Sequence, residues 1–127
     1  MLRILIIDDV ETNRFVLRNI ITDMGYQPVL AENGKQGLKI MERILPDLIL
    51  LDVAMPEMDG FEFADIIKKD VKTRNIPIIF ISAFDAPQDI VKGFEAGATT
   101  IVVGTSITSP KKIVQSLLYD AEQVKGN

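Results

Sequence analysis

The chain has 127 residues, of which 47% are hydrophobic and 25% charged, proportions that are typical of one globular domain. It has no cysteine and no histidine, which excludes disulfides, thiol catalysis, histidine general bases and histidine-ligated zinc sites. The formal net charge of −4 argues against nucleic acid as a partner. The apolar run Leu2–Ile7 is too short for a signal peptide or a membrane span, so we expect a soluble cytoplasmic domain without a membrane partner.

The first half of the chain predicts strands and helices in alternation. Leu2–Ile7 and Leu48–Leu51 are unbroken apolar runs followed by acids, as expected of strands that are buried on both faces. Pro28–Ala31 is a shorter strand candidate, and Thr12–Met24 predicts a helix that stops at a glycine. The predicted apolar stripe of this helix consists of Phe15, Val16, Ile20 and Met24.

The second predicted helix begins at Asn33, which is a favourable capping residue, and ends at Pro46. Its predicted apolar stripe consists of Leu38, Ile40, Met41 and Ile44. A loop over Val53–Gly60 then leads to a third predicted helix, Phe61–Lys69.

The second half continues the same alternation. Ile76–Ile81 and Thr100–Val103 predict two further strands. A helix is predicted over Pro87–Ala96, and a last helix begins at the cap Ser109 and runs to about Gln123. Every apolar segment of the chain therefore fits a repeated β-α unit.

Five β-α units predict an α/β fold of the flavodoxin-like (βα)5 type, a three-layer sandwich with a five-stranded parallel sheet. Right-handed crossovers place helices on both faces, and we expect the strand order 2-1-3-4-5. We expect residues 1–127 to form a single domain.

Acidic residues follow two of the predicted strands: Asp8 and Asp9 come after the first strand, and Asp52 after the third. If these strands are neighbours, three carboxylates converge at one edge of the sheet, where ligands of such folds bind. Their mutual repulsion favours a hard cation such as Mg²⁺, and a carboxylate can also accept a phosphoryl group. The alternative is that acids at strand ends are simply solvated. The pair plus the third acid favours a site.

Ser82 ends the fourth predicted strand. Its hydroxyl could donate to a phosphoryl oxygen on Asp52, whereas taken alone it is an ordinary hydroxyl at a strand end.

Three stretches resemble the receiver domain of bacterial two-component response regulators, which also occurs fused to hybrid histidine kinases. The matching stretches are Ile6-Ile7-Asp8-Asp9, the run from Leu50-Leu51-Asp52 to Met58-Asp59-Gly60, and Phe80-Ile81-Ser82-Ala83. Thr12-Asn13-Arg14 is similar to receivers of hybrid kinases. The resemblance covers about residues 2–98.

This resemblance implies a role for each matching position. Asp52 would be the phosphoacceptor of a phosphorelay. Asp8, Asp9 and Asp52 would bind Mg²⁺ together with the backbone carbonyl of Ala54, and Ser82 would be the switch hydroxyl. The Ala54 side chain, two places after the phosphoacceptor, cannot position a water for dephosphorylation.

The resemblance also implies the partner. The phosphodonor would be a phosphohistidine on a histidine kinase or a phosphotransfer protein, or a small compound such as acetyl phosphate. The domain would be a phosphoacceptor and not an enzyme with a separate substrate.

The last quarter of the chain, about residues 97–127, departs from the receiver pattern. Receivers normally carry a Lys-Pro pair after the fifth strand, and Gly104 and Thr105 stand at those positions here. Receivers usually have an aromatic residue in that strand, where this chain has Ile101.

Gly97–Val114 is similar instead to the final strand, loop and helix of phosphate-binding (β/α)8-barrel enzymes. In those enzymes backbone amides of a glycine-rich turn hold a phosphate group. We therefore expect an anion site at Gly104, Thr105 and Ser106, and we hypothesise that the chain is a recombined or engineered chimera.

Lys111 and Lys112 lie in the first turn of the last predicted helix, where a cation opposes the helix dipole at a cost of roughly 0.3–1 kcal/mol each. A bound anion would offset this cost. Two exposed lysines without any ligand are the equally simple alternative.

Two functions compete on these observations. The first is a phosphoacceptor domain that signals. The second is a folded scaffold that binds metal and phosphate without signal output. A metabolic enzyme is the least favoured class, because the catalytic residues of such barrels lie on strands that this chain lacks.

Overall fold

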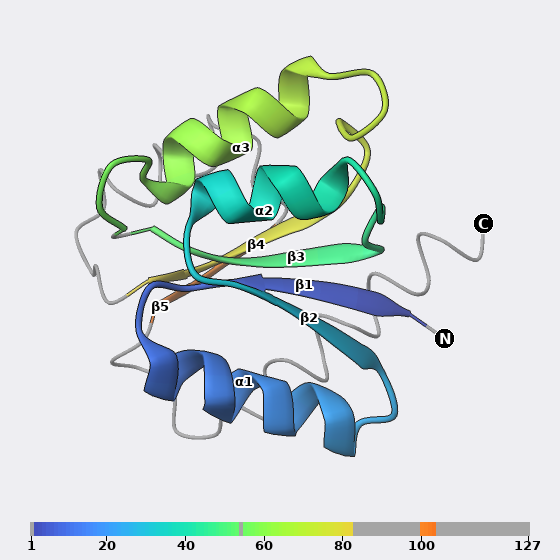
Figure 1. Ribbon diagram of the computed structural model, residues 1–127, viewed down its shortest axis with the longest axis vertical. Helices are drawn as coiled ribbons and strands as arrows, with labels where there is room; N and C mark the ends of the chain where they lie inside the picture. Colours follow the sequence, from blue (N-terminus) through green and yellow to red (C-terminus); the bar gives the residue numbers. More distant parts are fainter. Residues whose placement is uncertain (1, 54, 83–99, 104–127) are drawn as a thin grey trace.

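The computed structural model describes residues 2–53, 55–82 and 100–103 (Figure 1). Its five strands form one parallel sheet in the order β2-β1-β3-β4-β5. They are β1 (Arg3–Ile7), β2 (Gln27–Ala31), β3 (Leu48–Asp52), β4 (Ile78–Ser82) and β5 (Thr100–Val103). The predicted flavodoxin-like fold class and strand order are confirmed.

Three helices are described, and they cover both faces of the sheet (Figure 1). The helices α2 (Gly34–Met41) and α3 (Gly60–Lys69) lie on one face, and α1 (Glu11–Asp23) lies on the other. The two remaining predicted helices, 87–96 and 109–123, fall outside the described residues. No helix in the described part of the chain is long and apolar enough to cross a membrane.

Alternation along each strand divides the hydrophobic core into two clusters. Leu5 and Ile7 of β1 contribute to a cluster with Phe63 of α3, whereas Ile4 and Ile6 contribute to a cluster with Ile21 of α1. All six side chains are at most 1% exposed. The apolar run of β1 is therefore continuous because both of its faces are covered.

The apolar face of α1 differs in part from the predicted stripe. Phe15 and Val16 are 55% and 53% exposed, so their predicted burial is wrong. The side chains that face the sheet are Leu17, Ile20, Ile21 and Met24. These four follow the spacing i, i+3, i+4, i+7, which forms one continuous stripe on a helix. Phe15 and Val16 fall outside that stripe.

Helix α2 is shorter than predicted. Its Asn33 cap is confirmed, because the side chain accepts a hydrogen bond of 2.8 Å from the Gln36 amide. The helix ends at Met41 instead of Pro46, and Ile44 is 37% exposed. The amides of residues 43 and 44 both donate to one carbonyl, that of residue 40, and this shared acceptor marks the end of the regular α-helical ladder.

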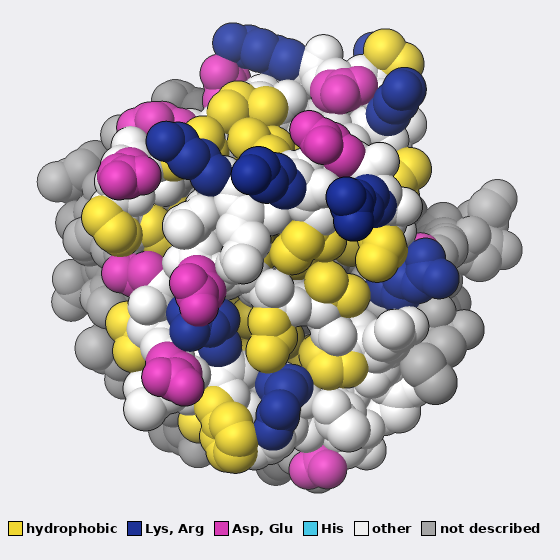
Figure 2. Space-filling model, viewed as in Figure 1, with side chains coloured by type: hydrophobic (Ala, Val, Ile, Leu, Met, Phe, Trp, Pro, Cys, Tyr) yellow, Lys and Arg dark blue, Asp and Glu magenta, His cyan; other side chains and the backbone are white. Residues whose placement is uncertain are grey.

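The side of the molecule seen in Figure 2, with α2 and α3 above the sheet and α1 below it, has a mixed surface. Lys and Arg side chains lie in a row across it, with Asp and Glu side chains around them and hydrophobic side chains between them. On α2 and just after it, the exposed basic residues Lys35, Lys39 and Arg43 recur every fourth position and so share one side. This face has no large area of a single charge sign.

Candidate metal centre

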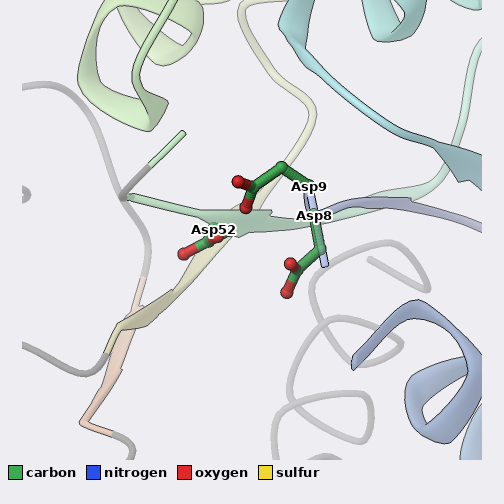
Figure 3. A group of neighbouring side chains, drawn as sticks. All are labelled: Asp8, Asp9 and Asp52. Carbon is green, nitrogen blue, oxygen red and sulfur yellow. The ribbon is translucent and has the colours of Figure 1, made fainter. Parts of the chain in front are cut away.

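The structure brings together three of the residues that the sequence singles out. Asp8 and Asp9 directly follow β1, and Asp52 is the last residue of β3, the strand next to β1. Each residue offers one carboxylate oxygen, and these three atoms all lie within 4.8 Å of one another. Figure 3 shows the three side chains at the carboxyl ends of the two strands.

Asp8 is the buried member of the cluster, with 4% of its surface exposed. One carboxylate oxygen accepts a 2.9 Å hydrogen bond from the Val10 amide. The backbone amide of Asp8 donates to the Ala31 carbonyl of β2 at 3.2 Å, and its carbonyl accepts a 2.7 Å bond from the Arg14 guanidinium. Asp8 is thus held through its side chain and through both of its backbone polar groups.

Burial raises the pKa of the Asp8 carboxyl above its ordinary value of 3.8. The Val10 amide, a hydrogen bond from the Asn13 side chain and the charge of Arg14 act against this rise, and the neighbouring Asp9 adds to it. Burial thus outweighs the hydrogen bonds and the charge of Arg14 in their effect on this pKa. A cation at the cluster would offset this effect of burial.

Asp52 is positioned by a close approach of α3 to the end of β3. The Gly60 amide donates a 2.9 Å hydrogen bond to the Val53 carbonyl. A Cβ atom on Gly60 would lie 2.5 Å from the Asp52 carbonyl oxygen, closer than real Cβ contacts allow. Asp52 belongs to β3 and Gly60 to α3, and these two elements cannot easily move apart. Position 60 therefore requires glycine.

The loop between β3 and α3 packs against α2 beside the acids. The Met58 side chain lies so close to Gly34 that a Cβ there would be 2.7 Å from its sulfur. Glu57 has a left-handed backbone, with φ of 66°, and its carboxylate lies 3.8 Å from the Lys35 ammonium. A non-glycine residue in this conformation is uncommon and often found at functional sites.

The other predicted site residues are placed only in part. Ser82 ends β4, and in the β3–β4 register Asp52 is the partner of Ile81, so Ser82 comes one position later at the same edge of the sheet. Its side chain is outside the described part. Several predicted residues lie wholly outside the described part: Ala54, the predicted anion-site residues Gly104, Thr105 and Ser106, and the lysines 111 and 112.

Sequence reasoning missed two residues that shape this site. The sequence pattern assigns Arg14 no contact with the acids, although its guanidinium donates a hydrogen bond to the Asp8 carbonyl. Gly60 ends a predicted loop and a receiver-like stretch, and neither pattern indicates that it determines how closely α3 approaches Asp52. The signals for both lay within the resembling stretches, yet each contact depends on how a helix docks against the sheet.

The donor set of the cluster consists of carboxylate oxygens, one of them on a buried residue with a raised pKa. Hard cations such as Mg²⁺ take oxygen ligands and usually bind through one or two carboxylates plus waters. Asp8, Asp9 and Asp52 therefore fit a magnesium ion.

Comparison with known proteins gives a consistent family. The family model for the response regulator receiver domain matches residues 4–117. Response regulator PleD of Caulobacter vibrioides is 43% identical over 97 residues, which cover 76% of this chain and 21% of PleD. The chain thus spans about a fifth of that relative's length. Because the family match extends through most of the atypical last quarter, it does not support the chimera hypothesis.

Solved structures agree with this match. The receiver domain of a signal transduction histidine kinase from Syntrophus aciditrophicus has a TM-score of 0.86 and 30% identity, covering 95% of this chain and 89% of that one. The receiver domain of the sensor histidine kinase PA1611 from Pseudomonas aeruginosa has a TM-score of 0.82 and 26% identity, covering 92% and 93%. The PA1611 structure has a magnesium ion coordinated in its active site cleft.

Proposed function

Since this chain belongs to the response regulator receiver family, we propose that it is a phosphoacceptor domain that takes a phosphoryl group on Asp52 with the help of Mg²⁺. The observation that carries this proposal is the convergence of three carboxylate oxygens within 4.8 Å at the carboxyl end of the sheet. Asp8, Asp9 and Asp52 would hold the metal ion. The Ala54 carbonyl and the Ser82 hydroxyl, by resemblance, would complete the site.

In the proposed reaction, a carboxylate oxygen of Asp52 attacks the phosphorus atom of the donor. A new phosphorus–oxygen bond forms while the bond from phosphorus to the donor's nitrogen or oxygen breaks, and the leaving group takes a proton. When bound, Mg²⁺ supplies positive charge that offsets the charge of the transferring group. Asp52 is only half-buried at the end of β3, so a donor can approach it, whereas buried Asp8 serves as a fixed ligand.

The proposed donor is a histidine kinase or a phosphotransfer protein, which the receiver family uses and which fits the absence of histidine in this chain. The domain would thus act as a phosphoacceptor and not as an enzyme with a separate substrate. We propose that residues 1–127 form one such domain, supported by the family match over residues 4–117. Gly104 stands where receivers carry a lysine, so the proposal concerns acceptance of the phosphoryl group and no particular output.

The test is intact mass spectrometry after incubation with Mg²⁺ and acetyl phosphate. The unmodified chain should gain the mass of one phosphoryl group, and it should not do so when EDTA removes the metal. Asp52→Asn is the matched control, since it keeps the size of the side chain and removes the nucleophilic carboxylate. Equal labelling of the chain and of Asp52→Asn, or no labelling of either, would contradict the proposal.

A further inference from the structure

We infer that Arg14, together with Asn13, is a positioning residue that holds Asp8 in the geometry needed for Mg²⁺ binding. This inference rests on the proposed function, because it concerns the same metal site. It assigns a role to the Asn13-Arg14 pair, which sequence reasoning connected only with the kinase-fused receivers.

Arg14 lies in the first two turns of α1, next to the carboxyl end of β1. Its Nη1 atom donates a 2.7 Å hydrogen bond to the Asp8 carbonyl, and its Nη2 atom lies 3.9 Å from a carboxylate oxygen of Glu32, just after β2. The Arg14 side chain is 13% exposed, whereas that of Glu32 is 68% exposed. The guanidinium is therefore enclosed between α1 and the ends of two neighbouring strands.

Several groups hold Asp8 in place, each through a different contact. The Val10 amide fixes one carboxylate oxygen at 2.9 Å, and the Asn13 side chain also hydrogen-bonds to this carboxyl. The Asp8 amide donates a hydrogen bond to the Ala31 carbonyl, and the Asp8 carbonyl accepts one from Arg14. In the described residues Arg14 provides the side-chain donor to that carbonyl, so it controls the orientation of the peptide that links Asp8 to Asp9.

Two effects of Arg14 on a bound cation oppose each other. Its positive charge repels Mg²⁺, so removal of the charge alone would tighten binding. The position it gives to Asp8 favours Mg²⁺, so removal of the contact would weaken binding. The guanidinium donates to a carbonyl and not to a metal-binding carboxylate, and Glu32 at 3.9 Å offsets part of its charge. We therefore expect the positional effect to dominate.

Groups that orient metal ligands without touching the metal typically change metal affinity by about 10–100-fold when they are replaced. Arginine is suited to this position because its planar fork can reach the carbonyl and Glu32 through different nitrogens. A lysine could donate to the carbonyl as a single point charge without spanning both groups.

The experiment is titration of the full chain with Mg²⁺ alone by isothermal titration calorimetry. Arg14→Met should weaken Mg²⁺ affinity by about 10–100-fold, and Arg14→Lys should give an intermediate affinity. Arg18→Met is the matched control: Arg18 lies one turn later on α1, with its guanidinium 4.7 Å from the centre of the exposed Phe15 ring. It should change Mg²⁺ affinity by less than about twofold.

A second readout separates positioning from a general loss of stability. Thermal unfolding in EDTA shows whether each variant folds, and labelling by acetyl phosphate at saturating Mg²⁺ should largely recover in Arg14→Met. If Arg14→Met does not fold, the same comparison is made with Arg14→Lys, whose affinity must lie below that of the unmodified chain.

The outcomes distinguish this inference from the proposed function. If the unmodified chain binds no Mg²⁺ and takes no phosphoryl group, the proposed function is wrong. If the unmodified chain binds Mg²⁺ and the folded Arg14 variants bind it equally well or more tightly, only the positioning role of Arg14 is overturned.

Discussion

At the scale of single residues, Asp8 is the most deeply buried of the three acids. It is 4% exposed, and burial raises the pKa of its carboxyl in the chain without metal. Hydrogen bonds from Val10, Asn13 and Arg14 keep the side chain and its peptide in place but do not cancel the cost of burial. The burial of Asp8 therefore has a cost in the metal-free fold, which the proposed metal ion would offset.

This environment predicts a pH dependence of stability. Because the pKa of Asp8 is raised from 3.8 in the folded chain, the folded state binds this proton more tightly than the unfolded state does. The resulting stabilisation is fully present below pH 3.8 and is lost as the pH rises through the folded-state pKa. Asp8→Asn lacks this carboxyl and its pH dependence. The free energy of unfolding of Asp8→Asn minus that of the unmodified chain should therefore rise as the pH increases from 3.8 through the folded-state pKa of Asp8, and then level off.

Urea unfolding in EDTA at a series of pH values, followed by circular dichroism, measures this difference. Asp23→Asn, at the far end of α1, is the control for removal of an exposed carboxylate. If the curves of Asp8→Asn and the unmodified chain run parallel at all pH values, the cost of burying Asp8 is not what the structure indicates.

At the scale of elements, α1 connects the hydrophobic core to the site. Leu17, Ile20, Ile21 and Met24 pack it against the sheet, and its first two turns carry the residues that contact Asp8. The packing of the apolar stripe thus sets the rotation of the helix about its axis. That rotation decides that Arg14 faces the end of β1 while Phe15 faces solvent.

We expect Ile21→Ala to lower the free energy of unfolding by about 2–5 kcal/mol, because it deletes a fully buried side chain between α1 and the sheet. Phe15→Ala, which removes a larger but 55% exposed side chain, should cost less than about 1 kcal/mol, including its contact with Arg18. Urea unfolding of both variants tests the assignment. Equal losses would mean that α1 docks with a different face.

At the scale of the whole molecule, the site exists only in the folded chain, because the parallel sheet brings its acids together. Asp8 and Asp9 are more than forty positions from Asp52 in the chain, and only the pairing of β1 with β3 brings them together. The unfolded chain therefore has no comparable cluster. A cation that binds the cluster must bind the folded state in preference and so stabilise it.

Mg²⁺ at about one hundred times its dissociation constant should raise the free energy of unfolding by about 2.7 kcal/mol. The measurement is thermal or urea unfolding over a range of Mg²⁺ concentrations at fixed ionic strength. Asp52→Asn, which keeps the size of the side chain and loses one of the three carboxylates, should show a clearly smaller rise. An identical rise in both chains would point to nonspecific ion effects.

Much of this molecule follows from local patterns in the sequence. Continuous apolar runs followed by acids, alternating with amphipathic segments, determined the α/β class, and general rules for parallel sheets then led to the order β2-β1-β3-β4-β5. The meeting of Asp8, Asp9 and Asp52 was predictable for the same reason, since parallel strands end at a common edge. Their roles in metal binding and phosphoryl transfer stay predictions that the experiments above address.

Only the tertiary structure decided which face of α1 is buried, where α2 ends and which groups surround Asp8. Phe15 and Val16 are apolar like the residues of α1 that pack against the sheet, so hydrophobicity alone could not exclude them from the stripe. The contact of Arg14 with Asp8 and the approach of Gly60 to Asp52 join different elements. Such contacts depend on the docking and rotation of helices against the sheet, which arise from packing over the whole core and not from spacing along the chain.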